Sequence, residues 1–150
     1  INSSTSTGAY PESIHPISAG GMTGDGHYSW SSAEVLRLIR NSIVSEEGST
    51  LWITPALPKE WIPQNGLVFE VRSLPTLFGD ISIHLEKLDH KYTLKISHEF
   101  HQKPKMIKIR FHKKILKLFM DNKETIIRSL EATIPLQTNP IQFILEHGET

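Results

Sequence analysis

The chain has 150 residues, enough for one domain or slightly more. Lys and Arg together number 16, as do Asp and Glu, so the formal net charge is zero. This balance removes the main electrostatic reason to expect binding to nucleic acid or to an anionic membrane. The absence of Cys excludes disulfides, a thiolate nucleophile and Cys-ligated zinc. No apolar run reaches about 18 residues, so we expect no transmembrane helix.

Residues 1–30 have the composition of a loop. Proline and glycine recur too often for regular structure, at Pro11, Pro16, Gly20, Gly21, Gly24 and Gly26. A loop of this length is unusual in a compact domain unless it is functional or covers a site. The chain opens with Ile1 and a polar stretch rather than with Met, so we expect a piece of a longer protein; a tag remnant or a processed start is the alternative.

Residues 32–44 are predicted to form an amphipathic α-helix. Apolar residues recur there at spacings of three and four: Val35, Leu36, Leu38, Ile39, Ile43 and Val44. Ser31 and Glu34 have the spacing of a capping box at its start, and Gly48 follows its expected end. The apolar stripe is broad, so the helix needs partners on more than one side.

From residue 50 onward, alternating apolar and polar residues predict β-strands. Segments 81–86 and 92–97 flank a turn and predict a hairpin. Further strands are predicted at 51–53, 67–72, 107–111, 115–120, 126–134 and 141–145. This pattern indicates a mainly β fold, an antiparallel β-sandwich preceded by a long loop and one amphipathic helix. We expect a core of Ile81, Ile83, Leu85, Leu94, Ile96, Ile107, Ile109, Phe111, Phe143 and Leu145.

Charge also changes near residue 50. Residues 1–50 carry two arginines against five acidic residues, a net charge of −3, and the remainder carries +3. We therefore expect two domains: 1–50, with the loop and the helix, and 51–150, the β-sandwich. The basic run over 103–114 is interpreted as outward-facing strand charge, because acidic residues elsewhere offset it. Nucleic acid and membrane are therefore not expected as partners.

Residue types that carry chemistry are concentrated between positions 10 and 30. Glu12, His15, Asp25 and His27 lie there, and Trp30 stands where the loop enters the helix, whose N-terminus favours anions. The histidines lack the i, i+4 spacing of a helical zinc motif, so neither a metal nor another cofactor is expected. Turn chemistry explains the Gly-Asp-Gly around Asp25 equally well, and packing is the simpler explanation of Trp30.

The order of these features resembles the C-terminal end of (α/α)6-barrel glycoside hydrolases and disaccharide phosphorylases, the six-hairpin glycosidase superfamily. Segments 10–13 (Tyr-Pro-Glu-Ser) and 30–34 (Trp-Ser-Ser-Ala-Glu) match the last barrel loop and following helix of glucoamylase-like members. This resemblance implies that helix 32–44 is the last helix of the barrel. It also implies that Glu12 is the general base.

A second resemblance is to the maltose- and kojibiose-phosphorylase group. Segments 23–27 (Thr-Gly-Asp-Gly-His) and 51–61 (Leu-Trp-Ile-Thr-Pro-Ala-Leu-Pro-Lys-Glu-Trp) are similar to segments on either side of the last helix in that group. The resemblance implies that Asp25, His27 and Trp30 shape a sugar or phosphate pocket.

Together these resemblances imply the C-terminal fragment of a carbohydrate-active protein whose parent hydrolyses glycosidic bonds. Because inverting hydrolysis needs two carboxyl groups, the general acid is expected upstream, and the isolated chain is expected to be inactive. The alternatives are a disaccharide phosphorylase parent and a non-catalytic β-sandwich that binds a glycan or a protein. The expected partner is a carbohydrate substrate in the parent, with self-association through the exposed helix when the barrel is absent.

Overall fold

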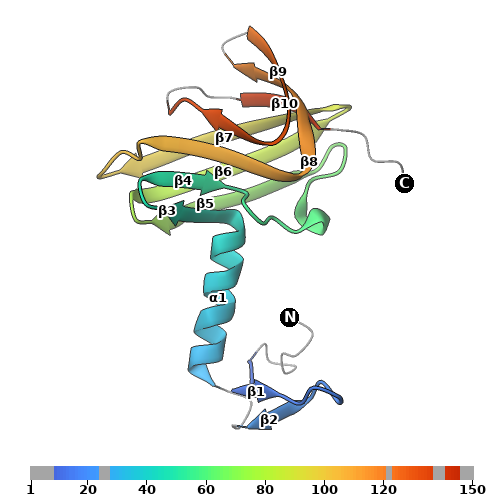
Figure 1. Cartoon of the computed structure of the whole chain (residues 1–150), viewed down its shortest axis with the longest axis vertical. Helices are drawn as coiled ribbons and strands as arrows, with labels where there is room; N and C mark the ends of the chain where they lie inside the picture. The colour runs from blue at the N-terminus through green and yellow to red at the C-terminus, as the bar shows by residue number, and fades with distance from the viewer. Residues whose placement is uncertain (1–8, 24–27, 121–122, 137–140, 146–150) are drawn as a thin grey trace. The chain divides into compact units, whose positions relative to one another are not determined.

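A computed structural model of the protein describes residues 9–23, 28–120, 123–136 and 141–145 (Figure 1). The chain divides into two compact units, Ile1–Arg40 and Asn41–Thr150. The first contains β1 (Ser13–Ile14), β2 (Gly21–Thr23) and most of α1 (Ser29–Ile43). The second contains β3 (Val44–Glu47), β4 (Thr50–Ile53), a short 3-10 helix η1 (Lys59–Trp61), β5 (Val68–Thr76), β6 (Gly79–Leu88), β7 (Lys91–Phe100), β8 (Met106–Met120), β9 (Lys123–Ile134) and β10 (Ile141–Leu145).

Strands β3 to β10 form one eight-stranded sheet in the second unit. The strand order is β3-β4-β8-β10-β7-β6-β5, and β9 pairs with β8 off this path. Neighbouring strands are antiparallel except β4 and β8, which are parallel. Strand accounts for 58% and helix for 14% of the structure, and the sheet curves nearly into a barrel (Figure 1). The mainly β, antiparallel class preceded by one helix is therefore confirmed, with one continuous curved sheet supplying the facing layers.

The core lies inside this curved sheet and consists of the residues that alternation predicted. On β6, Ile81, Ile83 and Leu85 are fully buried, whereas Ser82 and His84 between them are half-buried on the other face. The other predicted core residues are buried as well: Leu94, Ile96, Ile107, Ile109, Phe111, Phe143 and Leu145. Each strand thus has one buried face, and this alternation fixes the register of the sheet.

The end of the helix differs from the sequence-based expectation. Residue 44 was predicted to be helical, but it begins β3, which pairs with β4 across a turn that contains Gly48 at φ +58°. The predicted capping box is also wrong, because α1 begins at Ser29 and Ser31 lies inside it. Glu34 instead pairs with Arg37, at 3.2 Å. Strand pairing therefore overrides the helical spacing of the apolar residues at this junction.

The predicted strands 107–111 and 115–120 are one long strand, β8. Its pairing with β9 shifts register between Arg110 and Ile115, so the intervening polar residues form a bulge within the strand rather than a loop. Within the described part of the chain, no helix combines the length and the apolar composition needed to cross a membrane.

Candidate functional site

Glu12, the predicted general base, lies directly before β1 in a small hairpin. Its backbone N–H donates to the carbonyl oxygen of Thr23, at 3.3 Å. In the adjacent pair of the hairpin, the Ser13 and Thr23 hydroxyl oxygens lie 2.6 Å apart. The Glu12 residue itself is exposed. The hairpin thus holds the backbone of Glu12 while its carboxylate faces solvent.

His15 organises the turn of this hairpin. Its backbone N–H donates to the carbonyl oxygen of Gly20 at 2.8 Å, and its own carbonyl accepts the N–H of Ala19 at 2.9 Å. Its Nδ1 accepts the backbone N–H groups of Ile17 and Ser18, at 3.3 and 3.2 Å. The Nδ1 atom of His15 therefore stabilises the turn by accepting these two backbone hydrogen bonds. No group of three His, Asp or Glu side chains among the described residues could hold a metal ion.

A backbone hydrogen bond joins the segment before Glu12 to the start of α1. The N–H of Tyr28 donates to the carbonyl oxygen of Tyr10, at 3.0 Å. Pro11 is buried, and a Cβ on Gly21 would lie only 3.0 Å from the Cβ of Pro11. A side chain at position 21 would therefore push against Pro11, and the close packing favours glycine there. Two elements, β2 and the start of α1, therefore position the backbone leading to Glu12.

Of the other predicted site residues, the structure describes Trp30 but not Asp25 or His27. Trp30 is the second residue of α1 and is 75% exposed, so it is available for contact rather than buried as a packing anchor. Asp25 and His27 lie outside the described residues. The first unit thus contains Glu12 and Trp30 as exposed side chains of a hairpin and of the helix that follows it.

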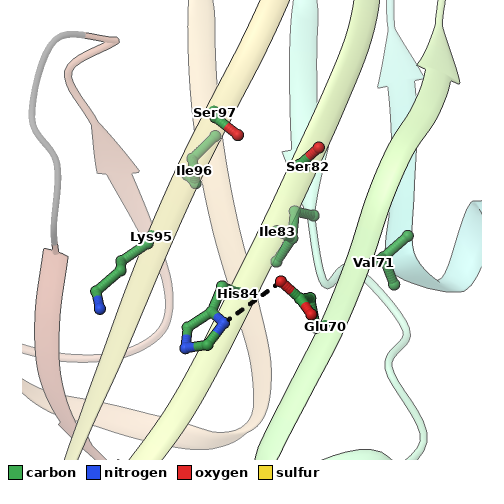
Figure 2. A pocket seen from close by; sticks show the side chains of 8 residues that line it. All are labelled: Glu70, Val71, Ser82, Ile83, His84, Lys95, Ile96 and Ser97. Atoms are coloured by element: carbon green, nitrogen blue, oxygen red, sulfur yellow. Dashed lines mark ion pairs between the residues drawn. The ribbon is translucent and has the colours of Figure 1, made fainter.

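A row of charged side chains on the second unit was not predicted from the sequence; Figure 2 shows it beside a pocket of about 120 Å³. Glu70, His84 and Lys95 are opposite one another on β5, β6 and β7. His84 Nδ1 lies 3.8 Å from Glu70 Oε1, and its Nε2 lies 3.6 Å from Glu86 Oε2. Lys95 Nζ is 4.0 Å from Glu86 Oε1.

One end of this row is an exposed ion pair. Arg72 Nη2 lies 2.9 Å from Glu70 Oε2. The hydrogen bond from Arg72 is the main cause that lowers the pKa of Glu70. Desolvation opposes it, and the charges of Arg72 and His84 lower the pKa further. Every acidic group in the row thus has a basic neighbour. The pocket is also smaller than typical small-molecule sites, so we interpret the row as a cross-strand charge network rather than a ligand site.

Comparisons with protein-family models, with curated proteins and with solved structures found no match to this chain. The functional interpretation therefore rests on the residues and their geometry.

Proposed function

We propose that this chain supplies the general base of a glycosidic-bond-cleaving site in a larger carbohydrate-active protein, and that Glu12 is that base. The observation that carries the proposal is the placement of Glu12. Its own N–H is bonded to β2, the carbonyl of Tyr10 before it is bonded to the N–H of Tyr28 next to α1, and the residue is exposed. A positioned carboxylate open to solvent can reach and deprotonate a water molecule.

The reaction needs a second carboxyl group. In inverting hydrolysis the general acid lies about 6.5–9.5 Å from the base, so that a water molecule fits between substrate and base. Glu34, the other acidic residue described in the first unit, is paired with Arg37 on α1. The proposal therefore assigns the acid to another part of the larger protein. Exposed Trp30 would contact the apolar face of a sugar, and Asp25 and His27 would line the same pocket.

A phosphorylase is the second candidate, because the Glu12 segment is bonded to the residue just before α1. The amides at a helix N-terminus favour phosphate, which would then attack the glycosidic bond in place of water. Hydrolysis and phosphorolysis are separated by measuring disaccharide cleavage with and without inorganic phosphate. A non-catalytic sugar-binding protein would bind the disaccharide and cleave it under neither condition.

The proposal extends to the partners of α1. Leu36 and Leu38 are 68% and 71% exposed, and apolar side chains of this kind favour contact with another protein surface. We propose that neighbouring barrel helices cover them in the larger protein, and that a second copy covers them in the isolated chain. A sedimentation coefficient that stays constant over a wide range of concentrations would contradict self-association.

The test of Glu12 is made in the full-length protein. Glu12→Gln keeps the shape of the side chain and removes its basicity, so kcat should fall by about 100-fold or more while KM changes little. Azide should partly restore turnover by replacing the activated water. Glu34→Gln, in the same unit, is the matched control and should retain activity. A loss within a factor of about three in Glu12→Gln, less than 1 kcal/mol of barrier, would exclude Glu12 as the base.

A further inference from the structure

A second hollow, of about 490 Å³, lies on the second unit, away from the charge row of Figure 2. Its walls are residues 54–57 after β4, residues 110–112 in the middle of β8, and residues 130–131 of β9. This volume is in the range of small-molecule binding sites. The hollow has no role in the function proposed for Glu12.

The polar wall of this hollow is a fixed pair of opposite charges. Arg110 and Glu131 are paired across β8 and β9, and Arg110 Nε donates to Glu131 Oε1 at 2.8 Å. Arg110 Nη2 donates to the same oxygen. The guanidinium carbon also lies 5.0 Å from the ring centre of Trp52, a cation–π contact. Among the described residues, the pair uses only Arg110 Nε, Arg110 Nη2 and Glu131 Oε1, so the acceptor Oε2 and the N–H donors on Nη1 remain available.

A strained residue, Thr54, forms the part of the wall next to Arg110. Thr54 is 1% exposed and has φ +53°, which is rare for a β-branched residue. Its Oγ1 lies 2.8 Å from the carbonyl oxygens of both Ile53 and Arg110, and its N–H donates to the carbonyl of Ile43 at 2.7 Å. These bonds turn the chain out of β4 so that residues 55–57 face β8. Backbone strain of this kind is typically retained at ligand sites.

The rim of the hollow contributes a neutral imidazole. Partial burial lowers the pKa of His112, and the charges of Lys113 and Lys59 lower it further. At neutral pH the ring is therefore uncharged and offers one donor and one acceptor. Apolar surface comes from Leu57 and from Leu130, which is 46% exposed.

The paired charges of Arg110 and Glu131 favour a neutral ligand over an anion or a cation. An anion near Arg110 would also meet the carboxylate of Glu131, and a cation near Glu131 would meet the guanidinium of Arg110. A hydroxyl group both donates and accepts, so it satisfies the free atoms of this pair without net charge. We propose that this hollow is a binding site for a neutral polyhydroxy ligand of about the size of a sugar ring, with its C–H face on Leu130.

The proposal is tested by NMR titration of the isotope-labelled chain. Neutral monosaccharides, maltose and inositol are the first probes, and inorganic phosphate and citrate are the charged controls. At least one neutral probe should give saturable shifts at residues 54–57 and 110–112, with a Kd of about 1 mM, typical of a weak small-ligand contact. No saturation with any neutral probe, or saturation with the anions alone, would overturn the proposal.

Substitutions locate the site. Glu131→Gln and Arg110→Ala should each weaken binding by about tenfold, the cost of losing one charge-assisted hydrogen bond. The matched controls are Glu70→Gln and Arg72→Ala, which disrupt another exposed Arg–Glu pair of the same sheet and should leave binding unchanged. If the circular dichroism spectrum shows that Arg110→Ala does not fold, the binding affinity of Glu131→Gln is the test of the site. Unchanged affinity in Glu131→Gln, or loss of binding in Glu12→Gln, would contradict this location and separate it from the function proposed for Glu12.

Discussion

The two units of the molecule are held together by different interactions. Among the described residues, the buried hydrophobic side chains that form the core all lie in the second unit, from Ile43 onward. Of the described residues of the first unit, Pro11 alone is buried, and the hairpin is held by backbone and hydroxyl hydrogen bonds. Because hydrophobic burial is the main source of folding free energy, we expect the second unit, the β-domain, to be the more stable of the two. The described part of the hairpin that carries Glu12 has few buried side chains, so we expect it to be the less stable of the two.

Hydrogen exchange tests this comparison most directly. Core strands open only with global unfolding, whereas a short polar hairpin opens locally at little cost. The amides of Ile83 and Leu94 should therefore exchange at least about a thousandfold more slowly than those of Glu12 and His15, a difference of about 4 kcal/mol in opening free energy. Comparable protection of both pairs in the monomeric chain would show that the first unit is as stable as the β-domain.

Truncation of apolar side chains should show the same contrast in stability. Ile83 is 1% exposed, so Ile83→Ala should lower the free energy of unfolding by about 2–5 kcal/mol through lost burial and a residual cavity. Leu36→Ala on α1, where the side chain is 68% exposed, should change it by less than about 0.5 kcal/mol. Urea denaturation of both variants measures these values. Equal losses would place α1 in the cooperative core.

Substitution of two glycines in the second unit should lower the free energy of unfolding by intermediate amounts. Gly79 has φ +126°, and a Cβ there would lie 2.3 Å from the carbonyl oxygen of Glu99 on β7. Gly79→Ala should therefore push β6 and β7 apart and cost about 1–3 kcal/mol or more. Gly48→Ala, at φ +58° with open space around it, should cost about 1 kcal/mol, from backbone strain alone. A smaller loss of stability in Gly79→Ala than in Gly48→Ala would mean that β6 and β7 accommodate the added methyl group near Gly79 without cost.

The sequence predicted much of the second unit, because alternation reports directly which face of a strand is buried. Ile81, Ile83 and Leu85 follow this rule without exception. Periodicity failed where the pairing between strands decides the structure. Residue 44 has helical spacing but joins β3, because β4 offers a strand to pair with. The parallel pairing of β4 with β8 joins positions more than 50 residues apart, and local pattern carries no information about it.

Of the two candidate sites, the sequence pointed to Glu12 but not to the hollow beside Arg110, because only the first is formed by one continuous segment. Residue types and order drew attention to Glu12, whose chemistry is local to one loop. The hollow beside Arg110 was missed, because its groups come from three separate segments and its strained wall depends on the bond from Thr54 to the Arg110 carbonyl. A positive φ at a threonine is not visible in the sequence. Only the folded backbone shows it.

The smallest expected effect concerns the polar contacts of the β-domain. The hydrogen bond and charge of Arg72 hold the pKa of Glu70 below its ordinary value of 4.5, so Arg72→Ala should raise it toward that value in an NMR titration. A carboxyl whose folded-state pKa is depressed stabilises the fold above its unfolded pKa, and this stabilisation is lost as pH falls through the folded pKa. The variant should therefore differ in stability from the parent chain near neutral pH, by little because the pair is exposed, and the difference should vanish once the pH falls below the lowered pKa of Glu70. Lys95→Ala, which removes a charge from the same row without contacting Glu70, is the control and should leave this pKa unchanged.

Loss of one polar contact should affect local stability more in the first unit than in the second. Ser13→Ala removes one of the few hydrogen bonds that close the Glu12 hairpin, so the Glu12 amide should exchange faster in this variant. If Ser13→Ala left the exchange rate of the Glu12 amide unchanged, hydroxyl bonding would not be what holds the hairpin, and the contrast between the two units would have to rest on hydrophobic burial alone.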